Sequence, residues 1–299
     1  MRKILLHLDT SPTTSVFDRI VAYDAGADEV LSYGAVTADS VRDLVYGAIF
    51  TRGPKDLHNT AVFIGGTDMH DGEQVLAGAQ KAFFGQLRVS VMLDSNGSNT
   101  TAVAAVTKLV QTIGDVRGRR AVVVAGTGPV GTRAAGLLAR AGARVVITSR
   151  HADEAARVAA QIRNRFGGEV EAVVVPDPSQ LASALGDAEL LLNAGPAGVH
   201  LVPRDAWANR ARLRVVVDLN AAPPFGIDGV ELTDAGVDRH GVIAFGALGI
   251  GNFKMKVHKR CIAKLFERND LVLDAESIGE VARELLQSTP APPAVPPPG

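Results

Sequence analysis

The fold of this chain is decided by residues 119–150, RRAVVVAGTGPVGTRAAGLLARAGARVVITSR. An apolar run over Ala121–Ala125 leads into a glycine turn and an alanine-rich segment with helical spacing, and a second apolar run covers Arg144–Thr148. This order predicts a strand, a helix and a second strand. Two strands joined through a helix form a parallel βαβ unit, which is half of a doubly wound nucleotide-binding sheet.

The turn inside this unit fits the pattern G-x-G-x-x-G. Gly126 permits the tight turn, Gly128 lets a pyrophosphate approach the backbone, and Gly131 lets helix and strand pack closely. The first turn of the helix adds free N–H groups and a partial positive charge. A strand-to-helix turn without a ligand is the alternative, but the context favours a dinucleotide site. Its candidate residues are Gly126, Thr127, Gly128, Pro129, Val130 and Gly131.

The end of the second strand predicts which dinucleotide binds. NAD-binding units place an acidic residue about 20 residues beyond the glycines, where it holds the ribose 2′-hydroxyl. This chain has Thr148-Ser149-Arg150-His151 there, without a carboxylate. The guanidinium of Arg150 can bind a 2′-phosphate, and Ser149 can donate a further hydrogen bond. The alternative is that Arg150 is only a solvated charge. We therefore expect NADP rather than NAD.

Length and composition exclude several classes of protein. The 299 residues are enough for two domains, and 46% of them are hydrophobic. A net charge of −1 gives no indication of a nucleic-acid or membrane partner. The single cysteine, Cys261, excludes an internal disulfide and favours a reducing cytoplasm. The start of the chain, MRKILLHLDT, is typical of a first strand and not of a signal peptide.

The first hundred residues alternate between strand and helix patterns. Such alternation predicts a second parallel sheet covered by helices on both faces. We expect an α/β fold with two domains around a cleft, the second domain being a Rossmann-type doubly wound parallel sheet. The apolar runs expected as strands are Lys3–Leu8, Glu29–Tyr33, Ala61–Ile64 and Arg88–Leu93, and the helical patterns cover Val16–Ala25, Ser40–Ile49 and Glu73–Phe84.

The remainder of the chain completes this two-domain prediction. Residues 1–100 form the first domain, residues 101–255 form the NADP domain, and helices within 256–287 return to the first domain. Residues 288–299, STPAPPAVPPPG, are typical of a disordered proline-rich tail. Within the NADP domain, two apolar strands end in turns of small residues that contain Ala194 and Asn220. Ligands lie at the carboxyl ends of parallel strands, so both turns are candidate nicotinamide contacts.

A polar segment, Asp94-Ser95-Asn96-Gly97-Ser98-Asn99, follows the last strand of the first domain. The strand-end rule directs it toward the cleft, where Asp94 or Asn96 could bind a polar ring edge. The alternative role is capping of the following helix, because Ser and Asn are favoured there. Both roles are compatible. His7, His58 and His70 lack ligand spacing, so we interpret them as structural or surface residues, and no metal cluster is evident.

Six segments, the glycine turn among them, form a wider pattern along the chain. On these segments the chain resembles the methylene-tetrahydromethanopterin dehydrogenases of C1-metabolising bacteria, in particular the NADP-dependent type that also accepts methylene-tetrahydrofolate. The resemblance covers residues 3–287, with His151 and Asn252-Phe253 as departures from the expected pattern. The segments are SVFD (15–18), YDAGAD (23–28), MLDSNGSNTT (92–101), AGTGPVG (125–131), NAAPPFGI (220–227) and AFGALGIGNFKMKVHKRCIAKLFE (244–267).

The resemblance implies oxidation of a 5,10-methylene pterin to the 5,10-methenyl form, with hydride passing to NADP⁺. Two nitrogens stabilise the cation that forms, so a general base is not required. Positioning of two flat rings is the main task of such a site. A lysine matching Lys254 is tied to catalysis in the resembled family, and Lys256 is a second candidate that we place on the substrate. The resemblance also implies a homo-oligomer. Without it, both lysines could be solvated charges near a helix start.

Three other functions stay open at this point. A bifunctional dehydrogenase and cyclohydrolase would need a water-activating group near the lysine, and none stands out. Another two-domain NADP oxidoreductase, such as a shikimate-type dehydrogenase, usually relies on a Lys-Asp pair in the first domain. Lys3, Lys55 and Lys81 have no convincing partner for that role. A non-enzymatic NADP sensor would bind the cofactor without turnover.

Overall fold

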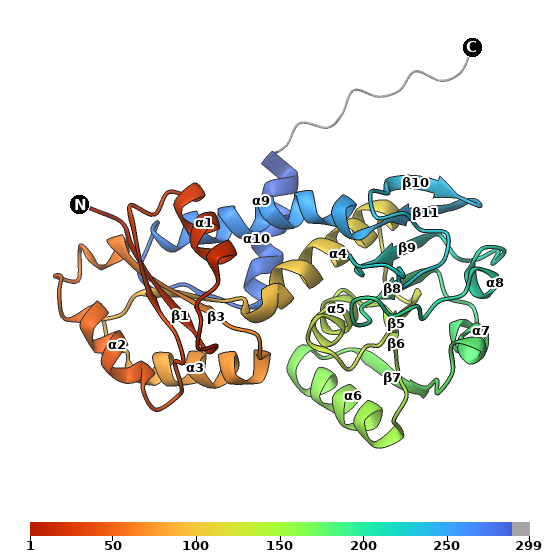
Figure 1. Cartoon of the computed structure of the whole chain (residues 1–299), viewed down its shortest axis with the longest axis horizontal. Helices are drawn as coiled ribbons and strands as arrows, with labels where there is room; N and C mark the ends of the chain where they lie inside the picture. Colours follow the sequence, from red (N-terminus) through yellow and green to blue (C-terminus); the bar gives the residue numbers. More distant parts are fainter. Residues whose placement is uncertain (289–299) are drawn as a thin grey trace, which may run out of the picture.

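The computed structural model, described here over residues 1–288, contains two α/β lobes side by side, each built on its own sheet (Figure 1). The sheet of the first lobe has the order β12-β4-β3-β1-β2, and all of its strand pairs are parallel. Its strands are β1 (Ile4–Asp9), β2 (Glu29–Tyr33), β3 (Thr60–Gly65), β4 (Ser90–Leu93) and β12 (Val272–Leu273), and its helices are α1 (Val16–Asp24), α2 (Val41–Ile49) and α3 (Met69–Ala82). The α/β prediction for residues 1–100 is confirmed.

The second sheet has the order β10-β11-β9-β8-β5-β6-β7, which is the doubly wound Rossmann arrangement with one added edge strand. Only β10 is antiparallel, and it pairs with β11. The strands are β5 (Arg120–Val124), β6 (Arg144–Ser149), β7 (Glu169–Val174), β8 (Leu190–Asn193), β9 (Val215–Asp218), β10 (Ala235–Arg239) and β11 (Val242–Phe245), and the helices are α5 (Pro129–Arg140), α6 (Ala152–Phe166), α7 (Leu181–Leu185) and α8 (Arg204–Trp207).

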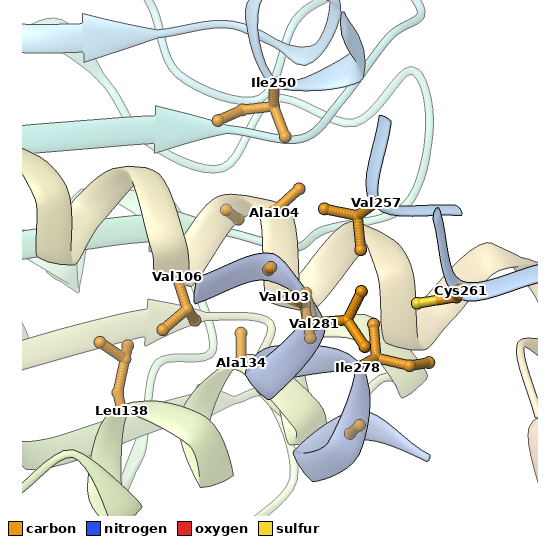
Figure 2. Packing of buried hydrophobic residues seen from close by; sticks show 14 of the residues in the cluster. Val103, Ala104, Val106, Ala134, Leu138, Ile250, Val257, Cys261, Ile278 and Val281 are labelled. Atoms are coloured by element: carbon orange, nitrogen blue, oxygen red, sulfur yellow. The ribbon is translucent and has the colours of Figure 1, made fainter. Parts of the chain in front are cut away.

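Three long helices join the two sheets. They are α4 (Ser98–Ile113), α9 (Ala247–Leu265) and α10 (Ala275–Ser288), and their apolar side chains pack against one another and against α5 (Figure 2). The resulting core is continuous from Phe63 in the first sheet to Val123 in the second. Burial of apolar surface therefore holds the two sheets together through α4, α9 and α10, and leaves the carboxyl ends of their strands free to carry a site.

Helix α9 begins at Ala247 and not at Lys256, which corrects the expected start of the C-terminal helices. The expected domain limit at residue 255 therefore falls inside this helix. Two glycines at this start are required by packing, because a Cβ on Gly246 would lie 2.0 Å from the Glu231 carbonyl oxygen and one on Gly249 would lie 1.8 Å from the Asp234 carbonyl oxygen. Among residues 1–288, no helix is both long and apolar enough to cross a membrane. Of the expected tail, Ser288 ends α10 and residues 289–299 lie outside the described residues.

Candidate functional site

A cavity of about 520 Å³ lies at the carboxyl ends of β5, β6 and β8. Six of the residues expected to bind the dinucleotide line it: Thr127, Gly128, Pro129, Ser149, Arg150 and Ala194. Gly126, Val130, Gly131 and Asn220 are not among its lining residues. The structure therefore brings the glycine turn and the end of β6 together around one space, as a dinucleotide site requires.

Glycine is needed at the three positions of the turn for different physical reasons. A Cβ on Gly126 would lie 2.7 Å from Cβ of Ile147, and one on Gly131 would lie 2.8 Å from the Ala125 carbonyl oxygen. These two glycines are required by the packing of strand and helix. A Cβ on Gly128 would meet no protein atom closer than 3.8 Å. Its backbone has a φ of −72°, which any residue can adopt. Gly128 therefore leaves space beside the cavity, which fits a pyrophosphate approaching the backbone.

Asn220 does not line the cavity, but it binds the backbone of two lining residues, Pro196 and Val199. Its side-chain oxygen accepts hydrogen bonds from the backbone N–H groups of Gly198 and Ala222, and its amide donates toward three carbonyl oxygens. The side chain is buried. Asn220 therefore holds the loops after β8 and β9 together, and its amide is already occupied by these backbone groups.

Ser149 and Arg150 lie at the cavity as expected, but a carboxylate lies there too. Glu154, in the first turn of α6, lines the same cavity and accepts a hydrogen bond from the Ser149 hydroxyl at 3.5 Å. The strand end itself has no carboxylate, as the sequence indicates, but the first turn of α6 brings one to the same cavity. The sequence of the strand end does not reveal Glu154, because only the fold of α6 brings this carboxylate back to Ser149.

Lys254 lies where three elements of the molecule meet. Its ammonium nitrogen is 4.8 Å from the ring centroid of Phe17 on α1. A Cβ on Gly97, at the start of α4, would lie 3.2 Å from the same nitrogen. The side chain is half-buried. Lys254 therefore faces the end of the first sheet from α9 and is held there by packing against an aromatic ring.

Asp94 is buried, and it caps α4. Its carboxylate accepts hydrogen bonds from the backbone N–H of Thr100 at 3.0 Å and from the Thr100 hydroxyl at 2.6 Å. Burial raises the pKa of Asp94 to about 6, although the Lys254 charge and the Thr100 hydrogen bonds oppose this. The capping role therefore occupies this carboxylate, while its charge still acts on Lys254.

Asn96 and Lys256, the two other expected substrate-binding residues, are both exposed. Asn96 is exposed at the end of the first sheet, and its backbone has a φ of 54°. Its N–H donates to the Gly66 carbonyl at 2.6 Å, which joins the ends of β3 and β4. Lys256 is exposed, and its charge acts on Lys108 of α4. Two residues along a helix turn the side chain by about 200°, so Lys256 does not share the face of Lys254.

Asp18, which was not predicted as a site residue from the sequence, interacts with the charge of Lys254 as Asp94 does, and these three residues form the Lys254 cluster. Asp18 lies in the first turn of α1, and burial raises its pKa, opposed by a hydrogen bond with the Ser15 side chain and by the charges of His7 and Lys254. The side chain is half-buried. His7, interpreted as isolated, is buried beside it, with its Nε2 3.5 Å from Asp9. The available signal was the strand-end rule, since α1 follows directly on β1.

Arg133 ties the glycine-turn helix to the first domain. This buried guanidinium on α5 donates to Glu73 of α3 at 2.6 Å and to the side-chain oxygen of Asn99 at 3.2 Å. A second cavity, of about 780 Å³, lies between the sheets, lined by Thr67 and Asp68 on one side and by Thr127 on the other. The carboxyl ends of both sheets therefore border one cleft.

Comparison with known proteins decides the family. Residues 16–96 match the family model described as methylene-tetrahydromethanopterin dehydrogenase, N-terminal. The chain is 32% identical to the NAD(P)-dependent methylenetetrahydromethanopterin dehydrogenase of Methylorubrum extorquens, across 95% of this chain and 99% of that protein. This chain belongs to the methylene-tetrahydromethanopterin dehydrogenase family. The resemblance expected from the sequence is confirmed.

A second relative supports this assignment, and a solved structure shows the same fold. The bifunctional protein MdtA of the same organism is 49% identical over 95% of this chain and 99% of its own length. Residues 122–206 match the saccharopine dehydrogenase NADP binding domain, so the expected cofactor, NADP, is confirmed. Shikimate 5-dehydrogenase from Listeria monocytogenes has the same fold, with a TM-score of 0.56 and 17% identity over 94% of this chain and 96% of its own. That likeness shows the fold alone.

Proposed function

We propose that this protein oxidises 5,10-methylene-tetrahydromethanopterin, or 5,10-methylene-tetrahydrofolate, to the 5,10-methenyl form with NADP⁺ as acceptor. The observation that carries the proposal is that the second cavity joins the glycine turn to Thr67 and Asp68 at the end of β3. Lys254 lies next to this strand end, beside Gly97. The supporting fact is the near full-length match to a family with this activity in its name. When bound, NADP⁺ supplies the hydride acceptor. The substrate nitrogens stabilise the cation that forms, so the protein does not need to supply a general base. Its own contribution is to orient the two rings and to place charges around them.

The chain's own residues fit this division of work. The space beside Gly128, the guanidinium of Arg150 and the turn at Ala194 would hold the cofactor along the ends of β5, β6 and β8. Lys254 would donate a hydrogen bond to the pterin ring and fix its face toward the acceptor. Asp94 and Asp18 place negative charge near Lys254. These carboxylates offset part of the positive charge of the Lys254 ammonium, which reduces its repulsion of the cation formed in the reaction.

We propose Asp18 rather than Asp94 as the carboxylate that binds the amino-pyrimidinone edge of the pterin. Both oxygens of Asp94 accept from Thr100, whereas Asp18 is half-buried beside Lys254, near Gly65 at the end of β3. The pterin edge offers two neighbouring N–H donors, and an ionised carboxylate has two acceptor oxygens. Asn96, exposed nearby, stays a second candidate for this edge.

Replacement of Asp18 with asparagine tests this assignment. We expect KM for the methylene pterin to rise about tenfold or more, because hydrogen bonds to a charged acceptor are worth about 1.5–3 kcal/mol. The KM for NADP⁺ should change little. Asp24→Asn is the matched control, since Asp24 ends the same helix and pairs with Lys259 on the surface at 2.7 Å. Equal pterin KM values in the two variants would contradict the role of Asp18.

We also propose the following organisation. Residues 1–100 with the returning C-terminal helices bind the pterin, residues 101–255 bind NADP, and α9 is shared by both parts. A cytoplasmic homo-oligomer remains our expectation from the single cysteine and the family. Light scattering of the purified chain measures its subunit number directly.

NADPH formation by the purified protein tests the function itself. Turnover with NADP⁺ and either methylene carrier is expected, and the ratio of the two rates identifies the preferred carrier. If NADP⁺ binds but neither carrier is oxidised, the dehydrogenase assignment is wrong.

A further inference from the structure

The cofactor cavity contains a carboxylate that a site for a 2′-phosphate does not need. Glu154 follows Arg150 by one helical turn, lies in the first turn of α6 and is half-buried at the cavity wall. Arg150 lines the same cavity from the end of β6 and is exposed. Positive and negative groups therefore border the same space, at the position where the adenosine ribose lies in this fold.

The hydrogen bonds around Ser149 show what Glu154 does to this space. The Ser149 hydroxyl oxygen accepts from the backbone N–H of His151 at 3.3 Å. Its proton is donated to Oε2 of Glu154. Ser149 is also buried, with an exposed fraction of 9%. The contact with Glu154 is long, 3.5 Å, so the carboxylate competes with a 2′-phosphate for the single Ser149 proton and does not hold it fully.

We propose that Glu154 is the residue that sets the balance between NADP and NAD, and that it makes NAD a usable second cofactor. This inference rests on the cofactor cavity of the proposed function. Arg150 favours the 2′-phosphate of NADP through its guanidinium. Glu154 disfavours that phosphate by like-charge repulsion and by competing for the Ser149 proton. The same carboxylate accepts a hydrogen bond from the 2′-hydroxyl of NAD, as acidic residues do in NAD-binding units.

The Glu154→Gln variant separates these effects. Glutamine has nearly the same shape as glutamate. The substitution removes the negative charge and weakens the hydrogen bond that the Ser149 hydroxyl donates to residue 154. We expect Kd for NADP⁺ to fall about three- to tenfold and Kd for NAD⁺ to rise about threefold, consistent with single charge-assisted contacts at a partly exposed site. The preference for NADP⁺ over NAD⁺ should therefore rise about tenfold or more relative to the wild type.

Asp153→Asn is the matched control. Asp153 is the neighbouring acidic residue in the same helical turn, is exposed and is not among the cavity-lining residues. The Asp153→Asn variant removes the same net charge as Glu154→Gln. Because surface charges are screened, the preference of this variant for NADP⁺ over NAD⁺ should stay within about twofold of the wild type. Arg150→Ala should weaken NADP⁺ binding and leave NAD⁺ binding nearly unchanged.

The measurement is calorimetric titration of the full chain with NADP⁺ and with NAD⁺, without any pterin. Because each variant is compared with itself across two cofactors, partial misfolding changes both constants together and not their ratio. Equal preference in Glu154→Gln and Asp153→Asn would overturn the proposal, as would a wild type that does not bind NAD⁺. A failure of pterin turnover would leave these binding constants, and hence this inference, untouched.

Discussion

Replacing Lys254 with methionine lowers kcat for methylene-pterin oxidation by about 10²–10³-fold, the size of loss seen when one preorganised hydrogen-bond donor is removed. The methionine keeps an unbranched apolar side chain against Phe17 but has no ammonium group. The pterin ring then loses the donor that fixes its face toward the cofactor, and orientation is the main contribution of this site. Binding of NADP⁺ should be unchanged, because Lys254 is not among the residues that line the cofactor cavity.

The control for Lys254 lies on the same helix. Lys259 of α9 makes a surface ion pair with Asp24, so Lys259→Met should keep kcat within about twofold, since exposed ion pairs contribute little. Steady-state kinetics of both variants with saturating NADP⁺ measures the difference. A Lys254→Met enzyme that retains more than about a third of the wild-type kcat would show that the lysine has no catalytic role.

Replacing Gly128 with alanine weakens NADP⁺ binding by about 10- to 100-fold, because the added methyl group occupies the space through which a pyrophosphate reaches the backbone. The variant should fold normally. Its φ suits alanine, and the nearest protein atom to the new Cβ is 3.8 Å away. Titration with NADP⁺ and thermal unfolding without cofactor measure the two effects separately.

Gly126→Ala provides the contrast to Gly128→Ala. Its Cβ would lie 2.7 Å from Ile147, so this variant should lose thermal stability before any ligand is added. If Gly128→Ala bound NADP⁺ as tightly as the wild type, the pyrophosphate would not lie at this turn. If it unfolded as readily as Gly126→Ala, the glycine would serve packing instead.

The sequence predicted the features that depend on local pattern. The βαβ unit around the glycine turn, the parallel strands and the meeting of strand ends follow from periodicity and from the strand-end rule. The start of α9 could not be predicted, because glycine lowers helix propensity. Only the tertiary structure explains Gly246 and Gly249, whose missing side chains let the helix approach the Glu231 and Asp234 carbonyl oxygens.

The site was predictable to the extent that its residues share a motif. Ser149 and Arg150 are adjacent to the glycine unit, and they line the cavity. Asp18 and Lys254 are far apart in sequence, and only the packing of α1 against α9 brings them together. Asp94 was ambiguous because a cap and a ligand use the same residue types, and the hydrogen bonds of Thr100 show the cap.

Direct transfer of hydride is the central claim, and an isotope label tests it. The substrate is methylene-tetrahydromethanopterin with two deuterium atoms on the methylene carbon, oxidised by this protein with NADP⁺ in ordinary water. We expect one deuterium in each NADPH molecule and one retained in the methenyl product, as measured by mass spectrometry. Deuterium lost to the solvent, or unlabelled NADPH, would show that the bond breaks by proton removal and would contradict the proposed mechanism.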